Sequence, residues 1–318
     1  MRRRPAIAVA SVVAMLLGAL WYASDAERLL AVAVARERGA ANLEARTTRL
    51  QEHDIVFVEG GVSEGPPILL LHGFAADKDN WTRFGKHLEA AGYRIVAPDL
   101  PGHGESSRLE KHSYDIPNQV EFVAAFLDDR GIESAHLVGN SMGGHIAGAF
   151  AALYPDRVRS LGLFAPAGVT APSLSERLRI HEQTGTNPLL VETVEDFDRL
   201  LEFVFVDPPD MPGVVKQYFA DRAVRNRAFN DKIYGDIQSE GRRLPLEPLL
   251  PLVEAPALVL WGDSDRVLHP SGMSVFEEGL RDVEAVLQRD MGHSPMLERP
   301  GETAGVYVDF LARRVEGR

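Results

Sequence analysis

The amino-acid sequence predicts an α/β fold, with a mostly parallel sheet, helices on both faces and an inserted helical cap. Short apolar runs alternate with longer amphipathic segments along most of the chain, as expected for repeated strand–helix–strand units. Runs such as residues 68–71 and 257–261 are continuously apolar, which is typical of parallel strands buried on both faces. The length of 318 residues suffices for one large domain or two small ones.

The composition excludes several kinds of function. Asp and Glu outnumber Lys and Arg by 46 to 34, and the formal net charge of −12 argues against a nucleic-acid partner. The absence of cysteine excludes disulfide bonds, thiolate metal sites and a cysteine nucleophile. We expect neither a cofactor nor a metal ion in the chemistry described below.

Residues 1–26 are predicted to be a signal anchor. Three arginines at residues 2–4 precede an uncharged apolar run over residues 6–23. A run of roughly 18 residues lies at the boundary between a signal-peptide core and a membrane-spanning helix. Because basic flanks stay in the cytoplasm, the rest of the chain is expected on the non-cytoplasmic side. The alternative is cleavage within residues 24–26, which would leave a secreted or periplasmic protein.

Residues 27–50 are predicted to form a helical linker between this anchor and the globular domain. Ala, Val and Leu alternate with Arg and Glu at roughly helical spacing. Such a helix would either lie on a membrane surface or act as a solvated spacer. Residues 51–318 then form the globular domain.

Within that domain, strands are expected where apolar runs lie between turn signals, and helices where apolar residues recur at helical spacing. The expected strands are residues 55–58, 68–71, 93–97, 135–138, 161–164, 257–261 and 284–288. The expected helices are residues 81–91, 116–129, 146–153 and 302–314. The alternation breaks over about residues 168–252, where charged helical segments are punctuated by Pro208-Pro209. We interpret this region as a cap inserted between two strands.

One stretch, Gly139-Asn140-Ser141-Met142-Gly143-Gly144, has the pattern of a nucleophile elbow. It lies between an expected strand and an expected helix, which is the context that the Gly-x-Ser-x-Gly motif requires. A serine at the tip of so tight a turn needs unusual backbone angles, and side chains at positions 139 and 143 would make the strand and the helix collide. The alternative, an incidental serine in a glycine-rich turn, does not account for this context.

Two further polar residues follow expected strands, at the carboxyl edge where the functional groups of a parallel sheet gather. Asp265 follows residues 257–261, and His293 follows residues 284–288. The chain order Ser141, Asp265, His293 is that of a hydrolase built on such a sheet. His293 would take the proton of the Ser141 hydroxyl, and Asp265 would orient the imidazole and stabilise the imidazolium.

Asp263 competes with Asp265 for the acidic position. The Gly-x-x-Asp spacing after the strand favours Asp265 and leaves Asp263 as a turn or cap residue. The backbone N–H groups of Met142 and Phe74 are expected to form the oxyanion hole.

The other histidines are not expected to act as bases. His72 and His103 lie in turns around the same site and are expected to be structural hydrogen-bonding residues. His136 and His145 are expected to face packing or solvent.

In combination these motifs resemble the α/β-hydrolase family over about residues 53–315. The motifs are His72-Gly73-Phe74, Asp99 to Gly104, the elbow, Gly262 to Asp265, and Gly292-His293. Within the family, the chain resembles the membrane-anchored monoacylglycerol lipases and related bacterial lipases and esterases. The resemblance implies hydrolysis of carboxyl esters, either glycerides or esters of other medium-length acyl chains. The substrate would be a lipid or a small ester.

Two other functions compete with a serine esterase or lipase. Hydrolases of carbon–carbon bonds in ring-cleavage products share the Asn-Ser-Met-Gly-Gly elbow, but they usually have Trp after the catalytic His, where this chain has Ser294. A non-catalytic ligand-binding protein on a hydrolase scaffold is the other alternative. Such proteins often lack a triad residue, whereas this chain retains all three.

Overall fold

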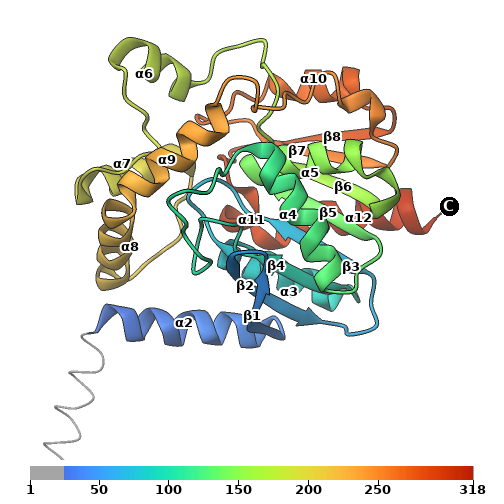
Figure 1. Cartoon of the computed structure of the whole chain (residues 1–318), viewed down its shortest axis with the longest axis horizontal. Helices are drawn as coiled ribbons and strands as arrows, with labels where there is room; N and C mark the ends of the chain where they lie inside the picture. Colours follow the sequence, from blue (N-terminus) through green and yellow to red (C-terminus); the bar gives the residue numbers. More distant parts are fainter. Residues whose placement is uncertain (1–24, 318) are drawn as a thin grey trace, which may run out of the picture.

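The computed structural model describes residues 25–317, and its centre is an eight-stranded sheet (Figure 1). The strand order is β1-β2-β4-β3-β5-β6-β7-β8. From β4 to β8 along this order the strands pair in parallel, whereas β1 and β2 pair antiparallel at one edge. The predicted mostly parallel sheet is confirmed. The strands are β1 (Leu43–Leu50), β2 (His53–Gly61), β3 (Pro67–Leu71), β4 (Arg94–Pro98), β5 (Ala135–Asn140), β6 (Val158–Phe164), β7 (Ala257–Gly262) and β8 (Val283–Gln288).

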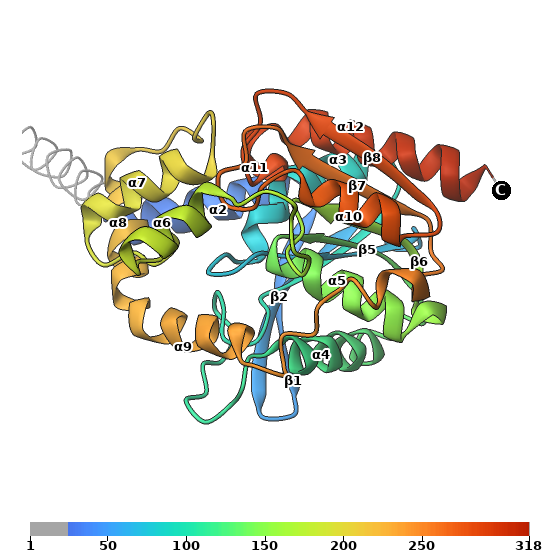
Figure 2. The ribbon, with the colours of Figure 1, turned by 90° about the horizontal axis from the view of Figure 1, so that it is seen from above.

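Helices cover both faces of this sheet (Figure 2). One face carries α4 (Ile116–Asp129), α5 (Met142–Leu153) and α10 (Gly272–Gly279). The other carries α3 (Thr82–Ala90), α11 (Pro295–Glu298) and α12 (Pro300–Leu311). Strand β3 shows how the sequence divides the core: Leu69 and Leu71 pack on the first face, whereas Ile68 and Leu70 pack on the second. Successive strand side chains point to opposite faces, so a continuous apolar run supplies both cores.

The inserted segment between β6 and β7 is helical. Its helices are α6 (Glu176–Thr184), α7 (Val194–Val204), α8 (Gly213–Arg225) and α9 (Arg227–Gln238). They lie together on one side of the sheet, at the left of Figure 1. We refer to this segment as the cap.

The predicted helical linker over residues 27–50 is wrong in its second half. Helix α2 (Ala26–Ala40) is capped by Asp25, whose carboxylate accepts hydrogen bonds from the first N–H groups of the helix, but Leu43–Leu50 is strand β1. Strand β1 lies at the sheet edge with most of its side chains exposed, so it lacks the alternation that identifies a half-buried strand. Helix α2 contacts β1, α3 and α8, and it is therefore part of the folded domain instead of a spacer.

The predicted anchor over residues 6–23 lies outside the described residues. Among residues 25–317, no helix combines the length and the apolar character needed to cross a membrane. Helix α2 is the described element that follows the predicted anchor in the sequence (Figure 1).

Candidate active site

Ser141 lies at the turn between β5 and α5 in the strained conformation that a nucleophile elbow requires. Its backbone angles are φ 54° and ψ −116°, and residues with a side chain seldom adopt a positive φ. The Ser141 N–H donates to the Phe164 carbonyl at 3.1 Å, and the Ser141 carbonyl accepts from the Ala167 N–H at 3.0 Å. Phe164 is the last residue of β6 and Ala167 lies just after it, so β6 and the segment that follows it hold the strained turn in place.

The glycines on either side of Ser141 are required by close backbone contacts. A Cβ atom at Gly139 would lie 2.1 Å from the Gly143 carbonyl oxygen, and one at Gly143 would lie 2.1 Å from the Leu71 carbonyl oxygen. The first turn of α5 therefore packs directly on the ends of β5 and β3. The predicted collision for side chains at positions 139 and 143 is confirmed by these distances.

Asp265 is buried in the loop after β7, with both carboxylate oxygens occupied. Its Oδ1 accepts from the N–H groups of Val267 at 2.8 Å and Leu268 at 3.0 Å. Its Oδ2 accepts from the Trp261 indole N–H at 2.9 Å and lies 2.7 Å from His293 Nδ1. These contacts hold the carboxylate in one orientation toward the imidazole.

Asp263 is arranged differently from Asp265. It is exposed, and its Oδ1 accepts a hydrogen bond from the Ser264 hydroxyl at 2.8 Å. Because Asp265 makes the contact with the imidazole, the geometry favours Asp265 as the acidic residue, as the spacing predicts.

His293 is held through its backbone as well as its ring. Its carbonyl accepts from the side-chain amide of Asn140 at 3.0 Å, so the residue before Ser141 contacts the residue that carries the imidazole. Its N–H donates to the Val204 carbonyl at 2.7 Å, at the end of cap helix α7. The structure thus brings Asp265 and His293 together beside the elbow.

Two backbone N–H groups beside Ser141 are available to an oxyanion. Met142 begins α5, where the first N–H groups have no acceptor within the helix. Phe74 lies in the loop after β3, and its neighbour Gly73 is against the elbow: a Cβ atom on Gly73 would be 3.4 Å from Ser141 Cβ. Within residues 25–317, neither the Met142 nor the Phe74 N–H donates a hydrogen bond. The Met142 N–H and the loop that carries Phe74 therefore lie beside the serine.

His72 orients the peptide group that carries the Phe74 N–H. Its Nε2 accepts from the Leu100 N–H at 3.0 Å, so its Nδ1 carries the proton and donates to the Gly73 carbonyl at 2.8 Å. Burial lowers the pKa of His72 to about 4, which keeps the ring neutral at pH 7 and preserves the acceptor. Because C=O and N–H of a trans peptide point in opposite directions, fixing the Gly73 carbonyl also fixes the Phe74 N–H.

The other buried histidines near the sheet have structural contacts. Burial lowers the pKa of His103 to about 3, and that of His136 and His145 to about 4. His103 and His145 contact backbone carbonyl groups, and His136 contacts the Ser160 hydroxyl at 2.8 Å. These neutral rings contribute packing and hydrogen bonds, as predicted.

Sequence reasoning missed two contributors to the site. Trp261 donates to the Asp265 carboxylate, and its position just before the Gly-x-x-Asp segment is the signal that could have revealed it. Val204 accepts the His293 N–H through its backbone carbonyl, so no side-chain type in the sequence marks it.

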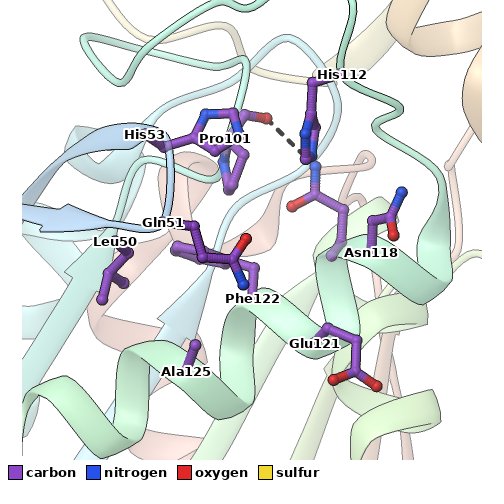
Figure 3. A pocket seen from close by; sticks show the side chains of 10 residues that line it. Leu50, Gln51, His53, Pro101, His112, Asn118, Glu121, Phe122 and Ala125 are labelled. Atoms are coloured by element: carbon purple, nitrogen blue, oxygen red, sulfur yellow. Dashed lines mark hydrogen bonds between the residues drawn. The ribbon is translucent and has the colours of Figure 1, made fainter.

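A cavity of about 260 Å³ lies away from the triad, between the β1–β2 turn and α4 (Figure 3). Its lining includes His53, Gln119 and Phe122 but none of the triad residues. Both ring nitrogens of His53 and the Oε1 atom of Gln119 are buried without a hydrogen-bond partner in the described chain. We do not assign it to the substrate. Among residues 25–317, no group of three or more His, Asp or Glu is placed to hold a metal ion.

Comparison with known proteins identifies the family. The family model for the alpha/beta hydrolase fold matches residues 66–300, and the chain belongs to the α/β-hydrolase family. Lipase 1 of Psychrobacter immobilis is 35% identical over 276 residues, which cover 86% of each chain. A monoacylglycerol lipase of Xenopus laevis is 35% identical over 258 residues, covering 78% of this chain and 75% of that one.

A solved structure is similar along almost the whole chain. It is the crystal structure of a membrane phospholipase A, described as a novel bacterial virulence factor, with 43% identity and a TM-score of 0.90. The match covers 99% of this chain and 100% of that one. The chain is a lipase- or esterase-like α/β-hydrolase, in agreement with the motifs.

Proposed function

We propose that the chain is a serine ester hydrolase that forms an acyl-enzyme at Ser141, with His293 as base and Asp265 as its acidic partner. The observation that carries the proposal is the 2.7 Å contact between His293 Nδ1 and Asp265 Oδ2, beside a serine held at a φ of 54°. The lipases among the relatives support the same chemistry. The mechanism needs no cofactor.

In the acylation step, Ser141 Oγ attacks the ester carbonyl carbon while His293 Nε2 takes the hydroxyl proton. Asp265 keeps the other proton on Nδ1, which leaves Nε2 as the base. The N–H groups of Phe74 and Met142 stabilise the tetrahedral oxyanion, a contribution of about 100- to 1,000-fold in rate for each donor. The imidazolium then gives its proton to the leaving alcohol oxygen as the C–O bond breaks.

Deacylation repeats this sequence with water as the nucleophile. His293 takes a proton from water, the hydroxide oxygen attacks the acyl carbon, and the proton returns to Ser141 Oγ as the acid leaves. The products are a carboxylic acid and an alcohol.

Replacement of the nucleophile tests the proposal. We expect Ser141→Ala to lower turnover of a short-chain p-nitrophenyl ester by about 10⁵-fold or more, with little change in thermal unfolding. Exposed Ser264 provides the matched control, and Ser264→Ala should retain activity. An irreversible serine phosphonate should label the wild type at Ser141. Retained turnover in Ser141→Ala contradicts the assignment, and a wild type with neither turnover nor labelling indicates a non-catalytic binding protein.

The substrate class that we propose is the acyl esters of glycerolipids. A monoacylglycerol lipase and a membrane phospholipase A are both among the similar proteins, and the second has the higher identity. Fatty-acid release from a monoacylglycerol and from a phosphatidylcholine with the same acyl chain separates the two. Faster release from the phospholipid favours a phospholipase, and release from the monoacylglycerol alone favours a lipase. A series of p-nitrophenyl esters from acetate to palmitate measures the preferred chain length.

We also propose that residues 6–23 anchor the protein in a membrane, with the catalytic domain on the non-cytoplasmic side. The basic residues before this run and the similar membrane phospholipase A support this location. Deletion of residues 1–24, which retains α2, should release a soluble and active enzyme. A variant that lacks residues 1–42 should be less stable than the variant that lacks residues 1–24, because it also loses the contacts of α2 with α3 and α8. A detergent-dependent product of the first deletion contradicts the proposal, and cleavage of the full chain within residues 24–26 supports secretion.

A further inference from the structure

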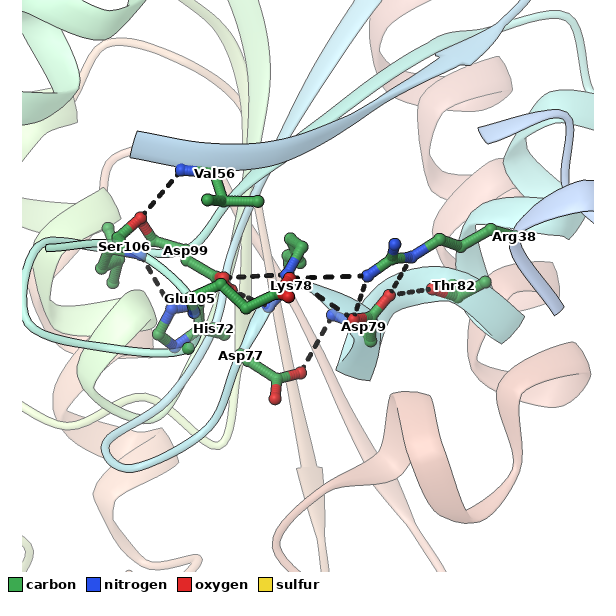
Figure 4. A network of polar contacts seen from close by, with 12 residues as sticks. Arg38, Val56, His72, Asp77, Lys78, Asp79, Thr82, Asp99, Glu105 and Ser106 are labelled. Carbon is green, nitrogen blue, oxygen red and sulfur yellow. Dashed lines mark hydrogen bonds and ion pairs between the residues drawn. The ribbon is translucent and has the colours of Figure 1, made fainter. Parts of the chain in front are cut away.

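Three consecutive residues, the last one of the loop of residues 73–77 and the two that follow it, pair with three different parts of the molecule. We call this loop the oxyanion loop, because it carries the Phe74 N–H. Figure 4 shows the polar network around these residues. The pairs are Asp77 with Arg222 of cap helix α8, Lys78 with Asp99 after β4, and Asp79 with Arg38 of α2.

The central pair fixes the loop to the sheet. Lys78 is 1% exposed, and Asp99 is fully buried. The Lys78 N–H donates to Asp99 Oδ1 at 2.7 Å, and its Nζ donates to Asp99 Oδ2 at 2.8 Å and to Glu105 at 2.6 Å. Because the pair is satisfied by several hydrogen bonds, it withstands burial in a way that an isolated charge does not.

The neighbouring pair joins the loop to the cap. Arg222 donates to Asp77 Oδ2 at 2.9 Å, and the two side chains are only 27% and 17% exposed. Burial alone would raise the pKa of Asp77, but Arg222 and Lys78 outweigh this effect and lower it. The cap also reaches the loop through Tyr234 of α9, whose ring centroid lies 5.7 Å from that of Phe74.

A short path connects Asp77 to the oxyanion donor. The Ala76 N–H donates to the Gly73 carbonyl at 3.3 Å, and Ala75 between them has a φ of 57°. The Gly73 carbonyl belongs to the same peptide group as the Phe74 N–H. The Gly73 carbonyl thus has two donors, His72 Nδ1 at 2.8 Å and the Ala76 N–H, and a displacement of Asp77 acts on the second. The planarity of the peptide transmits any resulting rotation of the carbonyl to the Phe74 N–H.

We propose that Arg222 is a positioning residue: by pairing with Asp77, it sets the orientation of the Phe74 N–H according to the position of the cap. The oxyanion donor is then fully aligned only while α8 is docked on the loop. This inference rests on the proposed ester hydrolysis and adds to it a residue that touches neither the substrate nor the triad. Its effect belongs to transition-state stabilisation, because the oxyanion exists only there.

The test compares Arg222→Ala with a cap arginine that makes no contact with the loop. Among the described residues, Arg227 of α9 pairs only with Glu192 and Asp231, which both lie within the cap. Arg227→Ala is therefore the matched control. With full-length enzyme in detergent and p-nitrophenyl butyrate, we expect Arg222→Ala to lower kcat about 10- to 100-fold, below the cost of losing the donor outright. KM should change by less than about threefold. Arg227→Ala should stay within about twofold of the wild type.

A double-mutant cycle identifies the partner. Asp77→Asn and Arg222→Gln should each lower kcat, and the double variant should be no slower than the slower single variant, because both remove the same link. Arg222→Lys should recover part of kcat, since it restores the charge but not the shape of the guanidinium. The proposal would be overturned if the losses in kcat of the two single variants multiplied in the double variant, or if only KM changed. Equal effects of Arg222→Ala and Arg227→Ala would also overturn it.

Two measurements distinguish a failure of this proposal from a failure of the proposed ester hydrolysis. Titration with the phosphonate counts the competent sites in each variant, so misfolded protein does not enter kcat. If Arg222→Ala does not fold, Arg222→Gln retains most of the side-chain packing and takes its place. A wild type that resists the phosphonate refutes the ester hydrolase itself, whereas a normal wild type with an unaffected Arg222→Gln refutes only the role of Arg222.

Discussion

The two sides of the candidate active site are held by different kinds of contact. On the side of the triad, Asp265 accepts from two backbone N–H groups and one indole, and the cap touches His293 through the backbone of Val204. On the side of the oxyanion loop, charged side chains make the links, and the outer partners Arg222 and Arg38 lie on helices outside the sheet.

This difference separates fixed parts of the site from adjustable ones. A backbone N–H or carbonyl group remains whatever the side chain at that position is, and salt affects its hydrogen bonds little. Partly exposed ion pairs weaken as salt increases and disappear with a single substitution. The contacts on the triad side are therefore expected to respond less to salt and to single substitutions than those of the oxyanion loop, although both sides contact the cap, through Val204 and through Arg222.

Between these two sides, the largest expected effect comes from the acidic residue on the triad side. Asp265→Asn should lower kcat by about 10⁴-fold, because the amide stabilises the wrong imidazole tautomer without disturbing the fold. Exposed Asp263 has no contact with the imidazole, so Asp263→Asn should change kcat by less than about tenfold. Steady-state kinetics of the two variants checks this ranking, and the reverse order would transfer the acidic role to Asp263.

On the side of the oxyanion loop, a smaller effect is expected from low pH on the free energy of unfolding. The pKa of His72 is about 4 in the folded chain, against an ordinary value of 6.5. Between these values the unfolded chain binds a proton that the folded chain does not, so stability is complete above pH 6.5 and falls as the pH drops toward 4. The share of His72 is about 3 kcal/mol.

Denaturant unfolding at a series of pH values measures this dependence. His72→Asn should reduce the loss of stability between pH 6.5 and 4 by this share, and His103, His136 and His145 should keep the rest. His181→Asn, at an exposed position, should retain the slope of the wild type. An unchanged slope in His72→Asn would show that His72 does not supply this dependence.

The smallest effect is expected where the triad side has redundant contacts. Trp261→Phe removes one hydrogen bond to Asp265 but leaves both backbone donors, so kcat should fall by less than about tenfold, or about 1 kcal/mol. Buried Trp81 provides the matched control, because its indole N–H has no partner in the described chain. Trp81→Phe should leave kcat unchanged. A loss in Trp261→Phe as large as that in Arg222→Ala would erase the distinction between the two sides.

Much of the fold could be predicted because the parallel strands are buried. The apolar run at residues 68–71 corresponds to β3, and residues 116–129 form α4 with the predicted bounds. Strand β1 was missed because it is an edge strand. Its charged side chains point to solvent on both faces, so its spacing could not separate a strand from an amphipathic helix.

The elbow of the candidate site could be predicted because its geometry depends on neighbouring residues. The glycines at 139 and 143 mark a contact that a Cβ atom would prevent, whatever the rest of the chain does. The pairing of Asp77 with Arg222 leaves no such mark. It depends on how the cap returns to the sheet, and neither residue has a spacing that identifies the other.

The Asn140 side chain has a consequence for any redesign of this protein. One amide donates to the carbonyl groups of both Phe164 and His293, and so joins the end of β6 to the loop that carries the imidazole. An elbow transplanted from another scaffold without a comparable amide would bring a well-formed serine to a histidine whose carbonyl has lost this contact, and only the bonds to Val204 and Asp265 would hold it. Residues 140, 164 and 293 should therefore be exchanged as one unit.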